Sequence, residues 1–115
     1  MRYLLLIHED PAATSAEPAA FEAMLAEYAV YTQSLADAGR LLGGEALQPP
    51  TVATTVSVRD GRRIVTDGPF AETKEQLAGY YLVEAPDLDA VIEDASRIPG
   101  ARHGTIEIRP ILEMG

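Results

Sequence analysis

The sequence predicts a single α+β domain, in which an antiparallel sheet is covered by helices on one face. Two stretches have the three- and four-residue spacing of apolar side chains that is typical of amphipathic helices, and shorter strand-like stretches surround them. An Asp-Gly pair between two alternating stretches predicts a tight hairpin. The chain has 115 residues, which fits one domain, residues 1–115, with a core of its own.

The first element is a strand at Tyr3–His8, with Leu4, Leu6 and His8 on one face. A helix begins at Pro18, because proline suits the first helical position, and ends at Gly39, where a left-handed residue is favoured. The apolar face of this helix consists of Phe21, Met24, Tyr28, Tyr31, Leu35 and Ala38.

The middle of the chain contains the hairpin. The segment LLGGEALQPP (41–50) is apolar but interrupted by glycine, which indicates an irregular or edge strand. Thr54–Arg59 and Arg62–Thr66 follow on either side of the Asp-Gly turn. If the loop has two residues, Val56 faces Val65 and Thr54 faces Asp67, so Asp67 lies on the apolar side of the hairpin.

The last third of the chain repeats the pattern of strand, helix and strand. Ala78–Glu84 is a strand, Asp87 is the expected N-cap of the second helix, and Thr105–Ile111 is the final strand. The helix is terminated by Pro99-Gly100, and its apolar face consists of Leu88, Val91, Ile92, Ala95 and Ile98. The complete order of elements is that of a ferredoxin-like fold.

Helices can cover only one face of such a sheet, yet several strands are apolar on both faces. A second copy of the chain is the most economical cover for the other face. Two sheets that face each other make a dimeric α/β barrel, and polar residues in its interior would form a site. We therefore expect a homodimer.

Composition excludes several classes of function. The net charge of −9 argues against binding to nucleic acid, which needs a basic surface. The chain has no cysteine, and no segment approaches the ~20 apolar residues of a membrane span, so we expect a cytoplasmic protein without membrane contact. No dinucleotide, P-loop or serine-nucleophile motif is present, and no cofactor is expected.

The segment 43–84, GGEALQPPTVATTVSVRDGRRIVTDGPFAETKEQLAGYYLVE, resembles the DGPF-domain proteins, a branch of the YCII-related family. MRYLLLIHED at the start and GTIEIRP near the end extend the resemblance over the whole chain. It implies a ferredoxin-like fold that pairs into a dimeric α/β barrel. It also implies an Asp–His pair in a pocket, with Asp67 at the aspartate position; the family's histidine has no secure counterpart here.

Asp67 and Phe70 each have two interpretations. Asp67 either caps the turn at Gly68-Pro69 or is an acid/base group whose charge is disfavoured by an apolar sheet face. The two roles are compatible. Phe70 is either a plug for the core or a ring that stacks on a ligand.

The chain has two histidines, His8 and His103, and each is a candidate site residue. His8 ends the first strand and is the better candidate for a partner of Asp67, against the alternative of a solvated strand end. His103 lies in a loop and is expected on the surface. The chain has no recognised metal-ligand spacing, so we expect no metal site.

Glu107 and Arg109 lie two residues apart on the last strand and therefore share a face. Arg109 can clamp a substrate carboxylate, or it can form a surface ion pair with Glu107. Glu45 in GGEAL resembles a family position between flexible glycines, and this resemblance makes it a further candidate for the pocket.

Two functional hypotheses follow. The first is a barrel dimer that binds a small anionic or oxygenated organic molecule, with Asp67 as acid/base, His8 as its assistant and Arg109 as anion anchor; catalysis would be of the isomerase or lyase type. The second is a non-catalytic regulatory dimer, because genes for DGPF-domain proteins often neighbour those of extracytoplasmic-function sigma factors.

Overall fold

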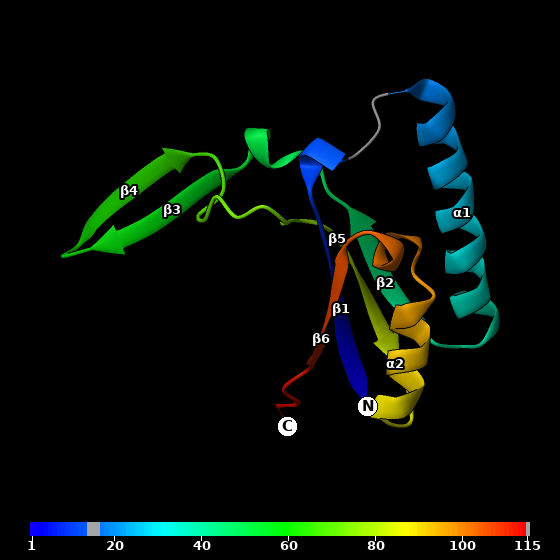
Figure 1. The fold of residues 1–115 in the computed structure, drawn as a ribbon. Coiled ribbons are helices and arrows are strands. Elements are labelled where there is room, and N and C mark those ends of the chain that lie inside the picture. The colour runs from blue at the N-terminus through cyan, green and yellow to red at the C-terminus, as the bar shows by residue number, and fades with distance from the viewer. Residues whose placement is uncertain (14–16, 115) are drawn as a thin grey trace.

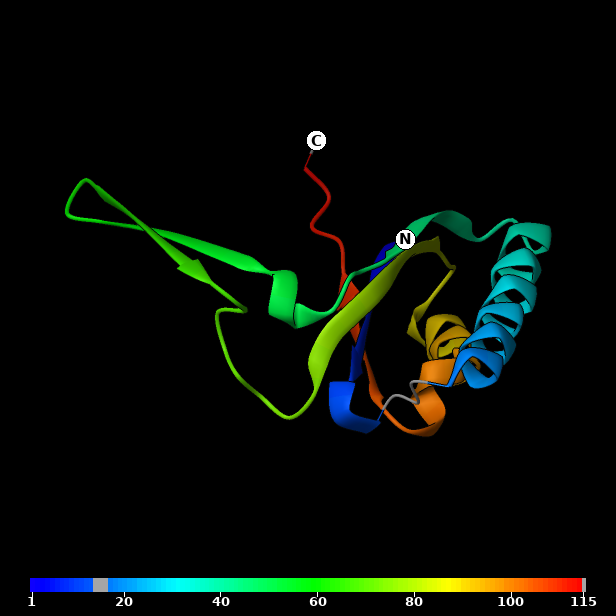
Figure 2. The ribbon, with the colours of Figure 1, turned by 90° about the horizontal axis from the view of Figure 1, so that it is seen from above.

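The structure, a computed structural model, describes residues 1–13 and 17–114. Four strands form one antiparallel sheet in the order β2-β5-β1-β6. They are β1 (Arg2–Glu9), β2 (Leu41–Ala46), β5 (Gln76–Glu84) and β6 (Thr105–Pro110). The helices α1 (Pro18–Asp37) and α2 (Leu88–Ser96) cover one face of this sheet and leave the other open (Figures 1 and 2). The ferredoxin-like α+β prediction is confirmed.

The ends of both helices follow from local sequence signals. Pro18 occupies the first turn of α1, and Gly39 has a φ of 72° just beyond its last turn, as the left-handed C-terminal position requires. The Asp87 carboxylate accepts a hydrogen bond of 2.8 Å from the backbone N–H of Ala90 and caps α2. The part of the chain that the structure describes also contains three short 3₁₀ turns: η1 (Pro11–Ala13), η2 (Pro50–Val52) and η3 (Pro99–Arg102).

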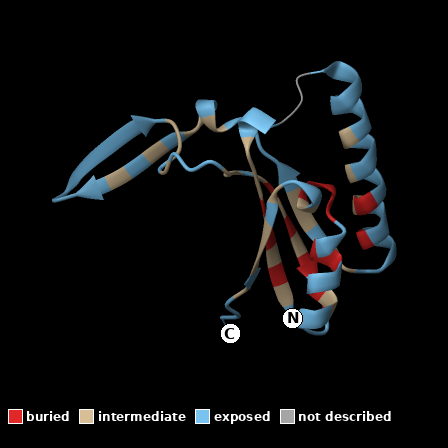
Figure 3. Ribbon diagram, in the orientation of Figure 1, coloured by how far each residue is buried: buried red, intermediate tan, exposed pale blue. Residues whose placement is uncertain are grey.

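The core lies between the helices and the covered face of the sheet (Figure 3). On β1 the buried side chains alternate with half-buried ones, so the strand contributes one set to each face. The fully enclosed core consists of Tyr3, Leu5, Ile7, Tyr31, Leu35, Tyr81, Val83, Ala85, Val91, Ala95 and Ile98. Tyr31 and Tyr81 meet edge to face with ring centroids 5.4 Å apart.

The hairpin stands outside this sheet. Strands β3 (Thr54–Arg59) and β4 (Arg62–Asp67) pair only with each other, and Asp60 and Gly61 both have positive φ at the turn. The predicted register is confirmed, with Val56 opposite Val65 and Thr54 opposite Asp67. One edge of β5 is occupied by β2 and the other by β1, so the hairpin does not pair with β5, the strand that follows it in the chain. It projects as an arm on the side away from the helices (Figures 1 and 2).

No helix among residues 1–13 and 17–114 is long and apolar enough to cross a membrane.

Candidate functional site

The open face of the sheet brings several of the predicted site residues together. In the ladders, Leu4 lies between Leu82 and Arg109, and His8 lies between Leu77 and Thr105. A complete row crosses the sheet between these two levels and consists of Glu45, Tyr80, Leu6 and Glu107. Residues that are directly opposite in a ladder share a face, so these side chains all belong to the surface that the helices leave uncovered.

His8, Glu107 and Arg109 form a continuous polar chain on this face. The Nε2 atom of His8 lies 3.1 Å from Oε1 of Glu107, and the Arg109 guanidinium donates to Oε2 of Glu107 over 3.3 Å. Glu107 therefore contacts both neighbours, one through each carboxylate oxygen. The side chain of His8 is 29% exposed and that of Arg109 is 67% exposed, so the imidazole is more sheltered from solvent than the guanidinium.

The hydrogen bond from His8, followed by that from Arg109, lowers the pKa of Glu107 below its ordinary value. With Glu107 ionised, Nε2 of His8 is the donor, which leaves Nδ1 as the proton acceptor of a neutral ring. An imidazole held by a carboxylate in this way is a standard acid/base arrangement. The guanidinium beside it suits a carboxylate or a developing oxyanion.

Glu45 lies at the far edge of the same face. It is exposed, and it is paired with Tyr80 across the β2–β5 ladder. Three strand spacings, about 14 Å, separate its strand from that of Glu107. Glu45 can therefore border a ligand on this face but does not belong to the His8 cluster.

Asp67 is placed on the arm and not beside His8. Its side chain is exposed, and it lines an open groove of about 370 Å³ with Pro50, Thr51, Gly68, Pro69, Glu72, Thr73 and Gln76. The expected capping role is wrong: within residues 1–13 and 17–114 the Asp67 carboxylate has no hydrogen bond, and the Gly68 N–H donates instead to the Ala53 carbonyl over 2.7 Å. In this chain the carboxylate partner of His8 is Glu107.

Phe70 does not plug the core. Its side chain is 91% exposed in the loop that follows the arm. The segment 68–75 is a series of bends, so the ring is not carried towards the helices by any regular element.

The family of the chain is decided by its sequence relatives. The model of the YCII-related domain matches residues 1–115, which is the whole chain. This chain belongs to the YCII-related family. An uncharacterised protein of Rhizobium meliloti (strain 1021) is 36% identical over 114 residues, and the match covers 96% of this chain and 92% of that protein. The YCII-related match therefore includes the sheet and the arm.

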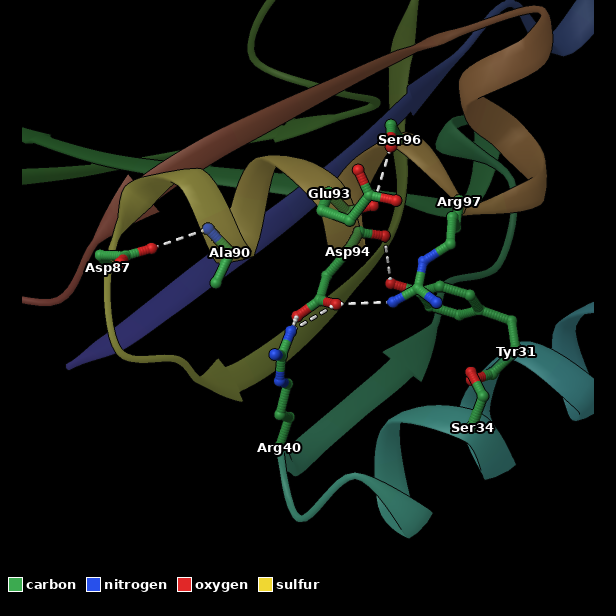
Figure 4. Close-up of polar contacts among 9 residues, drawn as sticks. All are labelled: Tyr31, Ser34, Arg40, Asp87, Ala90, Glu93, Asp94, Ser96 and Arg97. Carbon is green, nitrogen blue, oxygen red and sulfur yellow. Dashed lines mark hydrogen bonds and ion pairs between the residues drawn. The ribbon is translucent and has the colours of Figure 1, made fainter.

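A second polar centre in this YCII-related chain has no counterpart among the predicted site residues. Asp94 on α2 is fully buried and receives hydrogen bonds of 2.7–2.8 Å from Arg40 and of 2.7 Å from Arg97 (Figure 4). The Tyr31 hydroxyl donates to the backbone carbonyl of Asp94 over 2.7 Å. This cluster ties the end of α1 and the start of β2 to α2, and its carboxylate is fully paired, so we assign it to the fold. Its sequence signal is an Asp three residues after Val91, on the apolar stripe of α2.

A cavity of about 360 Å³ lies on the helix side, between α1 and η3, and it contains His103. His103 Nε2 lies 3.9 Å from Oε1 of Glu9, and its side chain is 56% exposed, so its surface placement is confirmed. The Tyr28 hydroxyl donates to Glu9 over 3.5 Å and accepts from the Gly100 N–H over 3.1 Å. Burial, followed by the charge of Glu9, raises the pKa of Tyr28 to about 12.

Among the described residues of this YCII-related chain, no group of three or more His, Asp or Glu side chains has the arrangement of a metal site.

Proposed function

We propose that this YCII-related protein binds a small anionic or oxygenated organic molecule on the open face of its sheet and transfers a proton there. The observation that carries the proposal is the Glu107 carboxylate, which joins the His8 imidazole to the Arg109 guanidinium at 3.1 and 3.3 Å. This group supplies a base, an orienting carboxylate and an anion anchor on one surface.

The surroundings of this group support binding. Leu4, Leu6 and Leu82 beside it are only half-buried, although the same strands are fully buried on their other face. A continuous half-buried apolar surface next to polar groups is typical of an interaction site. A second copy in front of this face would exclude water and strengthen the electrostatic contacts of Arg109 and Glu107.

The chemistry that fits is the isomerase or lyase type. Nδ1 of His8 would take a proton from a carbon next to a carbonyl. The electron pair of the broken C–H bond would form a C=C bond, and the π pair of the C=O bond would move to the carbonyl oxygen. Arg109 would stabilise the charge that develops on that oxygen or on a carboxylate of the substrate. Return of the proton to another atom completes an isomerisation.

Binding can be tested with a panel of small carboxylates, including acetate, pyruvate and malonate, by calorimetry. Arg109→Gln should weaken the binding of any ligand found by about tenfold or more, since a charge-assisted hydrogen bond is lost. Arg102→Gln is the matched control, because Arg102 is similarly exposed at 64% and pairs with Glu27 on the helix side. Equal losses in the two variants would contradict the proposal.

Proton transfer has its own test. Hydrogen–deuterium exchange at the carbon next to the carbonyl of a bound keto acid can be followed by NMR. His8→Asn should abolish the catalysed exchange while the native fold is kept. Exchange at the native rate in His8→Asn would show that another group is the base.

A further inference from the structure

The arm, residues 54–67, is largely exposed, and within residues 1–13 and 17–114 it pairs with no strand of the main sheet. Its strands pair only with each other, and the arm leaves the body on the side of the open sheet face (Figures 1 and 2). An isolated two-stranded hairpin is at best marginally stable in water. The arm therefore needs a partner surface.

The two faces of the arm differ, which indicates how it is covered. Val56, Val58 and Val65 share one face and are 59%, 60% and 56% exposed; Thr54, Arg63 and Asp67 lie on the same face. The other face is formed by Thr55, Ser57, Ile64 and Thr66, with Arg59 and Arg62 at the tip. The three exposed valines, which we call the apolar face of the arm, favour an apolar contact surface on their side.

The arginines at the tip of the arm are unpaired. Within residues 1–13 and 17–114, Arg59, Arg62 and Arg63 form no ion pair with a carboxylate. The only hydrogen bond that their side chains donate there runs from Arg59 to the Val58 carbonyl. Every other arginine pairs with a carboxylate of its own chain; these are Arg2, Arg40, Arg97, Arg102 and Arg109. The tip is thus a concentrated set of unsatisfied cations.

The distribution of charge along the chain indicates which partner the arm would bind. The arm carries three arginines against Asp60 and Asp67, whereas the rest of the chain carries 16 carboxylates against six cationic residues. The body of a second copy therefore carries a net negative charge, and its open sheet face provides apolar side chains as well. A second copy offers both kinds of contact that the arm lacks.

Dimensions agree with this partner. Each strand of the arm has six residues and is therefore about 20 Å long. Sheets that face each other stand about 10 Å apart. An arm that projects from one sheet towards a facing copy must reach that copy.

We propose that the arm is a clasp for a second copy of this chain, with the apolar face of the arm against that copy and the tip arginines paired with its carboxylates. By two-fold symmetry each copy both extends an arm and receives one. The inference rests on the proposed function only for the position of the second copy in front of the open face.

The clasp closes the site that the open face forms. The arm starts at the end of the sheet where His8 pairs with Leu77, because Gln76 at the start of β5 lines the same groove as Asp67. Asp67 shares the apolar face of the arm with Val65 and enters the interface with it. The open-face site is therefore incomplete in a single chain, and Asp67 borders it only in the dimer.

The contact can be mapped by photo-crosslinking from an unnatural benzophenone residue at position 58. An equal mixture of ¹⁵N-labelled and unlabelled protein separates crosslinks between copies from those within one copy by mass spectrometry. We expect mixed-isotope crosslinks from position 58 to peptides outside residues 54–67. The same probe at position 57, on the polar face of the arm, should give far fewer of them.

Crosslinks only within one copy, only from arm to arm, or equally from positions 57 and 58 would overturn the clasp. So would a monomeric mass by light scattering at the concentration of the experiment. The experiment needs no ligand, so its outcome is separate from that of the binding tests. If the crosslinks form but no ligand binds in a manner that depends on Arg109, the proposed function is contradicted and the clasp is supported.

Discussion

The two faces of the four-stranded sheet are built by alternate residues of the same strands, yet they serve different purposes. On β1, Leu5 is fully buried beneath the helices, whereas Leu6 on the next position is half-buried on the open face. The covered face is closed by the chain's own helices and is mainly apolar. The open face adds His8, Glu107 and Arg109 to its leucines, and an uncovered arm stands in front of it.

Because of this difference, neighbouring residues of one strand should contribute to different properties. Substitutions on the covered face should change the free energy of unfolding, and those on the open face should change association and ligand binding. The following experiments test that separation.

The largest effect is expected for Leu5→Ala. Removing a fully buried leucine leaves a cavity and should lower the free energy of unfolding by about 2–5 kcal/mol. Leu6→Ala should lower it by roughly 1 kcal/mol, since less apolar area leaves the protein interior. Chemical denaturation of both variants measures the comparison, and equal losses would mean that the two faces do not differ.

The second largest effect is expected for the buried carboxylate of Asp94. Asp94→Asn should lower the free energy of unfolding by about 3 kcal/mol, because the fully buried group loses its charge while Arg40 and Arg97 remain around it. Glu107→Gln, which breaks the open-face cluster, should have much less effect on unfolding but a large one on ligand binding. A greater loss of stability in Glu107→Gln would contradict the assignment of the two clusters.

The arm should affect association and not folding. The triple variant Arg59→Glu, Arg62→Glu, Arg63→Glu should weaken dimerisation on the order of 100-fold, because attraction to the acidic second copy becomes repulsion. The matched triple substitution by Lys preserves the charge and should stay dimeric. Sedimentation at several protein concentrations measures both, and a dimer unaffected by the Glu substitutions would argue against the clasp.

A smaller effect is expected on the helix side at high pH. The pKa of Tyr28 is about 12 in the folded chain against 10.0 when exposed, so the unfolded chain loses this proton first as pH rises. Stability should therefore fall between pH 10 and 12, and it should fall less in Tyr28→Phe. Thermal unfolding over this range measures the difference. An unchanged slope in Tyr28→Phe would show that Tyr28 makes no contribution.

The sequence predicted the regular elements well because their signals are local. Pro18 and Gly39 bound α1, Asp87 caps α2, and the Asp-Gly turn sets the hairpin register. Alternation along β6 also placed Glu107 and Arg109 on one face. Each of these signals needs only a few neighbouring residues.

The features that the sequence did not predict depend on which strands become neighbours in the sheet. The alternation of apolar and polar residues along a strand does not contain that information. The contact of His8 with Glu107 requires β6 to lie beside β1, and the separation of Asp67 from His8 requires β2 to occupy the edge of β5. Of the two interpretations of Phe70, the core plug is wrong, because the residue follows an arm that leaves the body and its side chain is exposed. The pairing of Asp94 with Arg40 cannot be read from the sequence because the two residues are 54 positions apart. The local signals of this cluster are the place of Asp94 on the apolar stripe of α2 and Arg97 three residues later.

The most direct test of the two-face account is an NMR titration of methyl-labelled protein with pyruvate or another small carboxylate that binds. We predict saturable shifts in the methyl signals of Leu4, Leu6 and Leu82, with those of Leu5 and Val83 unchanged, and the loss of these shifts in Arg109→Gln. Shifts that appear first on the covered face, or that persist without Arg109, would contradict the assignment of the open face as the site.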